Sequence, residues 1–119
     1  MIEQEKIGKL NAYISDHEWF DWEVFKFDGS NLTLIGGTDL VYYHLVELIF
    51  KNVYLISSRI NWRSDTSKPI FKLLSDREAY DFNYQHQIER GYSVYSLKVK
   101  DFDDDFFVVA EGFDFIIKK

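Results

Sequence analysis

The stretch "YHLVELIFKNVYLISS", residues 43–58, decides the fold class because its apolar residues follow the period of a β-strand. Val46, Leu48 and Phe50 occupy every second position, as in a strand that buries one face. Continued alternation would turn Val53 and Leu55 to the opposite face. An extra residue at Lys51–Asn52 returns both to the apolar side, so we predict a β-bulge and a bend of the strand there.

Two signals compete in residues 76–90. Ser75 and Glu78 form a capping box that would open a helix, and Gly91 would close it. Against this, "YDFNYQHQIE", residues 80–89, has large aromatic or apolar residues or histidine at every even position and polar ones at every odd position. Strict alternation over this length outweighs a short cap signal, so we predict a strand.

An amphipathic helix opens the chain. Ile7, Leu10 and Ile14 recur at spacings of three and four, which predicts a helix over residues 2–15 with one apolar face. Such a face has to be buried against another element, so we expect the helix to pack on a sheet.

Short strands account for most of the remaining chain. Residues 19–27 and 32–37 flank the turn-forming "DGSN" and predict a hairpin, and residues 92–101 and 106–118 predict two later strands. Because no βαβ rhythm is present, residues 1–119 predict a single α+β domain: a mostly antiparallel curved sheet or sandwich with one N-terminal helix.

Composition narrows the function classes. The 119 residues contain no cysteine, which excludes disulfides, thiolate nucleophiles and cysteine-based zinc sites. A net charge of −6 opposes binding to a phosphate backbone, so no nucleic-acid partner is expected. The chain starts with acids where a secretory signal has basic residues, and the longest apolar run, residues 40–50, is about half of a membrane span. We expect a cytoplasmic protein without a membrane partner.

Acidic residues and histidines raise the question of a metal site or a catalytic centre. The segment "DHEWFDWEVFKF", residues 16–27, offers ligands between His17 and Glu23, but an extended strand turns them in different directions and the HExxH spacing is absent. The acids of residues 101–105 lack the Gly and Glu of an EF-hand loop. No GxSxG or Ser-x-x-Lys motif accompanies the three histidines. We expect no metal, no cofactor and no enzymatic activity.

One candidate binding surface lies in residues 57–69, which hold the only proline, show no period and predict an exposed loop. Its stretch "RINWRSD" places Trp62 between Arg59 and Arg63, and these residue types are enriched at binding hot spots. Alternatively, Trp62 folds back onto the core and the arginines are ordinary surface charges. The sequence leaves both interpretations open.

A second candidate surface is acidic and would steer the chain toward a basic partner protein. Its candidate partner-binding residues are Asp101, Asp103, Asp104, Asp105 and Glu111.

The stretch "WFDWEV", residues 19–24, the stretch "FKNV", residues 50–53, and the late pair "YSLKVKD" and "FFVVAEGF" form a pattern. This pattern resembles that of small bacterial immunity proteins of the polymorphic-toxin type and their uncharacterised relatives. These often open their first strand with a Phe-His-Asp-like motif, which "WFDWEV" matches at Asp21, with Phe20 in place of the histidine. The stretch "FKNV", residues 50–53, matches a later Phe-x-x-Val, and "YSLKVKD" followed by "FFVVAEGF" matches a late hairpin. The resemblance implies a non-enzymatic domain that binds and occludes a basic toxin-like partner.

Two alternatives stay open. A small-molecule or enzymatic site in the cup of the curved sheet would use Tyr43, Tyr84, His86 and Tyr95. A structural module would instead associate with copies of itself through an exposed edge strand.

Overall fold

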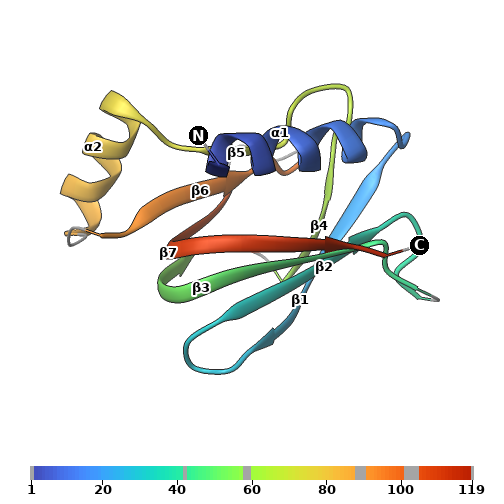
Figure 1. Ribbon diagram of the computed structural model, residues 1–119, viewed down its shortest axis with the longest axis horizontal. Coiled ribbons are helices and arrows are strands. Elements are labelled where there is room, and N and C mark those ends of the chain that lie inside the picture. The colour runs from blue at the N-terminus through green and yellow to red at the C-terminus, as the bar shows by residue number, and fades with distance from the viewer. Residues whose placement is uncertain (1, 42, 58–59, 88–90, 101–104, 119) are drawn as a thin grey trace.

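The structure is a computed structural model that describes residues 2–41, 43–57, 60–87, 91–100 and 105–118. In these residues the chain forms two helices and seven strands (Figure 1). In chain order they are α1 (Ile2–Ser15), β1 (Phe20–Phe27), β2 (Leu32–Gly37), β3 (Val46–Ser57), β4 (Asn61–Ser64), β5 (Phe71–Leu73), α2 (Asp76–His86), β6 (Ser93–Leu97) and β7 (Phe106–Ile117).

The strands form one antiparallel sheet in the order β4-β1-β2-β3-β7-β6-β5. The sheet curls until its two ends approach each other. The backbone N–H of Lys100, just after β6, donates to the carbonyl of Arg63 in β4 at 2.8 Å, and the Ser64 hydroxyl donates to the carbonyl of Lys98 at 2.6 Å. The predicted α+β class, the antiparallel curved sheet and the N-terminal helix are confirmed.

The inner face of the curl and helix α1 build the main hydrophobic cluster. On α1 the predicted stripe of Ile7, Leu10 and Ile14 is buried against this face. Two rows of strand residues that alternation placed on common faces are buried in the same cluster: Tyr95, Leu97, Val99, Phe106, Val108 and Ala110.

Polar contacts fix α1 over the sheet. The side chain of Asn11 donates to the carbonyl of Phe71 at 2.8 Å and accepts from the backbone N–H of the same residue at 3.0 Å, so it satisfies the outer edge of β5. The Tyr95 hydroxyl donates to the Glu3 carboxylate at 2.9 Å. Burial, followed by this hydrogen bond, raises the pKa of Tyr95 above its ordinary value, so the phenol stays protonated.

The predicted bulge in β3 is present, but at a different position. The pairing of β3 with β7 shifts register between Val53 and Leu55 rather than at Lys51–Asn52, although Asn52 itself takes a left-handed φ of 50°. Val53 packs against the main cluster, whereas Leu55 packs against a second cluster on the opposite face. The prediction that Val53 returns to the side of Val46, Leu48 and Phe50 is therefore confirmed, and the same prediction for Leu55 is wrong.

The strand predicted over residues 76–90 is also wrong where the structure describes it, because residues 76–86 form α2. The even-numbered residues divide into two pairs at the i, i+4 spacing of a helix. Tyr80 and Tyr84 face outward, while Phe82 stacks with His86 at 4.3 Å and packs on the second cluster. The two pairs lie on different faces of one helix, and together they place a large ring at every even position of the sequence, as in a strand.

The loop predicted over residues 57–69 contains a strand. Residues Asn61–Ser64 form β4, which pairs with β1 as an edge of the sheet. Within the described part of the chain, no helix is long and apolar enough to cross a membrane.

Gly36 tests the packing of the inner face. A Cβ atom there would lie 2.6 Å from a ring carbon of Phe20 and 2.7 Å from one of Trp22, and both rings are fully buried. We predict that Gly36→Ala destabilises the fold by about 1–3 kcal/mol through overpacking. In contrast, Gly8→Ala in α1 meets no atom within 4 Å and should stabilise by roughly 0.5–1 kcal/mol. Urea unfolding measures the change in free energy of unfolding for both variants. Equal changes would contradict the close packing of Phe20 and Trp22 around Gly36.

Glu47 anchors the C-terminal end of β7. Its carboxylate accepts hydrogen bonds from Lys118 at 2.8 Å and from His44 at 2.9 Å. These bonds, with that from Lys118 the larger cause, lower the pKa of Glu47 below its ordinary 4.5. The carboxylate form is therefore bound more favourably in the folded chain than in the unfolded chain.

A carboxylate with a lowered pKa stabilises the fold fully above its unfolded-state pKa and loses that contribution as the pH falls through the folded-state value. We predict that Glu47→Gln lowers the free energy of unfolding at neutral pH and that the difference from wild type disappears in acid. The variant Glu18→Gln, at an exposed position outside the helices and strands, should lower the free energy of unfolding at neutral pH by less than Glu47→Gln does. Urea unfolding across a pH series measures this, and a difference that persists in acid would contradict it.

Candidate functional site

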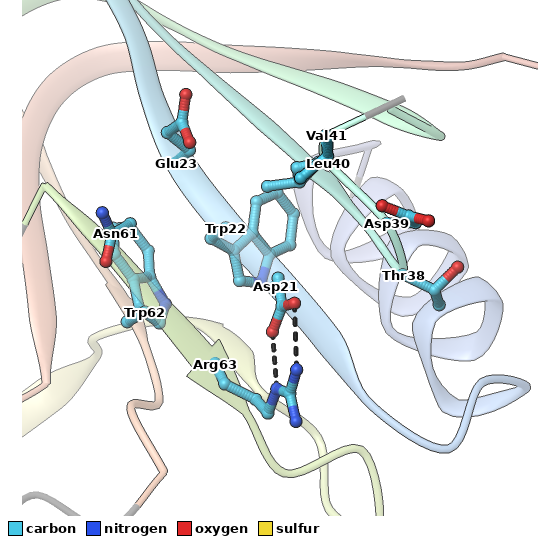
Figure 2. Close-up of a pocket in the computed structure, with 10 residues that line it drawn as sticks. All are labelled: Asp21, Trp22, Glu23, Thr38, Asp39, Leu40, Val41, Asn61, Trp62 and Arg63. Atoms are coloured by element: carbon cyan, nitrogen blue, oxygen red, sulfur yellow. Dashed lines mark hydrogen bonds and ion pairs between the residues drawn. The ribbon is translucent and has the colours of Figure 1, made fainter. Parts of the chain in front are cut away.

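An open hollow of about 430 Å³ lies outside the curl, between β1, β4 and the loop of residues 38–41 (Figure 2). Because Phe20 and Trp22 point inward, strand alternation turns Asp21 and Glu23 outward into this hollow. Its charged residues are Asp21, Glu23, Asp39 and Arg63.

Strand register brings Asp21 and Arg63 together. Residue 21 pairs directly with residue 63 in the β1–β4 ladder, and Figure 2 shows the two side chains facing each other. Arg63 donates from Nε to Oδ1 of Asp21 at 2.6 Å and from a terminal nitrogen to Oδ2 at 3.1 Å. This bidentate bond raises the pKa of Arg63, which therefore stays charged.

An aromatic ring supports the same arginine. The guanidinium carbon of Arg63 lies 5.4 Å from the centre of the Trp19 ring, within cation–π range. The indole N–H of Trp19 donates to the carbonyl of Thr38 at 3.2 Å, which ties the start of β1 to the loop above the hollow. Arg63 is thus held from two sides.

The hollow carries more negative charge than positive. Both oxygens of Asp21 are engaged by Arg63, whereas Glu23 and Asp39 form no ion pair with any other residue that the structure describes. Asn61, which pairs with Glu23 across the strands, adds a neutral amide. The arrangement can bind a cationic group that brings its own hydrogen-bond donors.

Trp62 belongs to the core. Its side chain is 6% exposed and stacks on Phe106 with ring centres 4.7 Å apart, as in the second of the two interpretations of the sequence. Trp62 and its cross-strand neighbour Trp22 also border the hollow, although the side chains of both belong to the main cluster. The indole N–H groups of both residues have no hydrogen-bond partner within the described chain.

Two further predicted partner-binding residues that the structure describes, Asp105 and Glu111, lie away from this hollow. Asp105 is mostly buried and pairs with Lys98 at 2.9 Å, and Glu111 accepts a hydrogen bond from Asn52 at 2.8 Å. Neither lines the hollow. Four residues lie outside the described part of the chain: Arg59, Asp101, Asp103 and Asp104.

The aromatic cup of the alternative hypothesis is not formed. Tyr95 is fully buried in the main cluster, while Tyr43 and Tyr84 are 54% and 77% exposed. Tyr84 and His86 lie on α2, packed against the face opposite to Tyr95. These four residues therefore do not line one cavity.

Sequence reasoning missed Asp39 and the grouping of carboxylates around Arg63. The outward alternation of Asp21 and Glu23 was the one available signal. Among the described residues, no group of three or more histidine and carboxylate side chains is arranged to hold a metal ion.

Comparisons with protein-family models, with curated proteins and with solved structures found no match to this chain.

The core position of Trp62 is testable. We predict that Trp62→Ala costs about 3–5 kcal/mol of stability, the range for truncating a buried aromatic residue. Trp62→Phe keeps a ring against Phe106 and removes an unpartnered N–H, so it should cost less than about 1.5 kcal/mol. Arg63→Ala removes an exposed ion pair and should cost below about 1 kcal/mol. Denaturant unfolding measures the free energy of unfolding of all three variants. A small loss for Trp62→Ala would show that the indole contributes little to the core.

Proposed function

We propose that this chain is a non-enzymatic protein-binding domain of the immunity type, which covers a basic partner and receives a cationic side chain of that partner in the hollow. The observation that supports this most is that Glu23 and Asp39, which line the hollow with the Asp21–Arg63 ion pair, form no ion pair within the described residues. A partner lysine or arginine placed beside either carboxylate would gain a counter-charge and leave the Asp21–Arg63 ion pair in place.

The charge of the whole chain supports the same kind of partner. With a net charge of −6, the chain attracts positively charged proteins over distances of about a Debye length and so increases their rate of encounter. Charge of this kind acts mainly on the association rate and on the choice of partner.

The form of the hollow supports a protein rather than an enclosed small molecule. It is open to solvent, and its floor is built from two hydrogen-bonded strands, which fix the backbone positions of Glu23 and Asn61. A backbone that is already ordered loses little conformational entropy when a partner binds. Small-molecule sites usually enclose most of their ligand, which this surface does not do.

The test compares three immobilised baits in lysate of the source organism. They are the wild type, Glu23→Gln/Asp39→Asn, and the control Glu5→Gln/Asp16→Asn, which removes the same charges from exposed positions elsewhere. We expect a basic protein that the wild type and the control retain and the hollow variant loses. Once that protein is purified, calorimetry should give an affinity weaker by about tenfold or more for the hollow variant.

The immunity interpretation adds a second measurement. Expression of the captured partner alone should stop growth, and co-expression with the wild-type chain, but not with the hollow variant, should restore it. The proposal is wrong if every basic protein that the charge-matched control retains is also retained by the hollow variant.

A further inference from the structure

One face of helix α2 packs on the second hydrophobic cluster, and the opposite face is exposed to solvent. Ala79 and Phe82 pack on the second hydrophobic cluster, with Phe82 5.1 Å from the ring of Phe107. On the outward face, Tyr80 and Tyr84 are 67% and 77% exposed. Two large rings in solvent contribute little to the stability of this helix, since tyrosine is not among the strong helix formers.

The outward face combines aromatic surface with charged side chains: Asp81, and the exposed Arg77 one turn before it. The rings of Tyr80 and Tyr84 lie 6.5 Å apart between centres and 25° from parallel, so they present two nearly parallel faces. Together with Asp81 and Gln85 they line a shallow hollow of about 600 Å³. Asp81 forms no ion pair with any residue in the described part of the chain.

We propose that this outward face of α2 binds an arginine-bearing segment of a protein, with the guanidinium group against the two tyrosine rings and Asp81 as its counter-charge. A cation within about 6 Å of a ring centre is attracted by the ring quadrupole, and a guanidinium placed in this hollow can approach both rings. Gln85 supplies an amide oxygen as a further acceptor.

Arginine fits this face better than lysine. Its guanidinium group is planar, stacks on aromatic faces and is weakly hydrated, whereas the lysine ammonium group is compact and strongly hydrated. Tyrosine is also enriched at binding hot spots, because it offers a large rigid surface at a low entropic cost.

This site is separate from the hollow at Glu23 and does not depend on it. Figure 1 shows α2 at one end of the molecule and the loop of residues 38–41 at the other. One site can therefore be removed without touching the other, which allows the two proposals to fail independently.

The experiment titrates the isotope-labelled full chain with a short capped peptide of alternating glycine and arginine and follows the backbone amide signals by NMR. We expect saturable shifts over residues 76–86. The variant Tyr80→Ala/Tyr84→Ala should weaken binding roughly tenfold, and a lysine peptide should bind the wild type a few-fold more weakly. A glutamate peptide should not bind.

Three controls keep the proposal falsifiable. Tyr80→Leu/Tyr84→Leu keeps apolar surface and helix propensity but lacks the ring faces, so it should also lose binding. Tyr43→Ala removes an exposed tyrosine at the other end and should change nothing. Glu23→Gln/Asp39→Asn should leave the shifts in α2 intact. Circular dichroism checks that each variant remains folded.

Several outcomes would overturn the inference. They are shifts confined to the hollow at Glu23, equal binding by the leucine variant, equal binding of arginine and glutamate peptides, or the absence of shifts. A wild-type dimer in sedimentation that the alanine variant converts to a monomer would show that a second copy of this chain occupies the face instead.

Discussion

The register shift between Val53 and Leu55 in the β3–β7 pair is the constraint on which the rest of the structure depends. These two strands are the longest in the sheet, at 12 residues each, and they join its two halves. Before the shift, β3 directs its apolar side chains into the curl, and after it Leu55 turns to the outside. A bulge also increases local twist, which favours a curled sheet over a flat one. A straight β3 would leave the second cluster without Leu55.

Apolar surface on both faces of one sheet explains why the fold needs two helices. The inner face is covered by α1, which also satisfies the outer edge of β5 through Asn11. On the outer face, α2 packs on the second cluster, which includes Val94, Phe107 and Val109 of β6 and β7. No helix covers the hollow at the start of β1 and at β4, where Asp21, Glu23, Asn61 and Arg63 are polar or charged, whereas Phe25 and Phe27 farther along β1 are exposed. The candidate site lies where the sheet needs no cover, and the exposed tyrosines lie on the helix that supplies the cover elsewhere.

Local patterns predicted most of this fold, and the errors have two causes: an ambiguous local pattern in one segment and contacts between distant residues. The helix over residues 2–15 and the buried rows of the late strands followed from periodicity, and the hairpin followed from its turn residues and its strand pattern. Residues 76–86 misled because the pairs Tyr80/Tyr84 and Phe82/His86 occupy two faces of one helix and together imitate alternation. The hollow was not predictable in the same way. Asp21 meets Arg63 across 42 positions of sequence, and no local pattern specifies that register.

Arg63 gives the candidate site a form of selectivity that acidic charge alone lacks. A chain with a net charge of −6 attracts many basic proteins, so charge provides encounter but little discrimination. Inside the hollow, Arg63 is held by Asp21 and Trp19 and repels any cation placed near it. Under the proposed function, a partner would have to bring its cation toward Glu23 or Asp39 and keep it away from the guanidinium group. A repulsive element fixed beside an attractive one rejects partners whose charges are spaced differently, and this is how an acidic surface becomes selective.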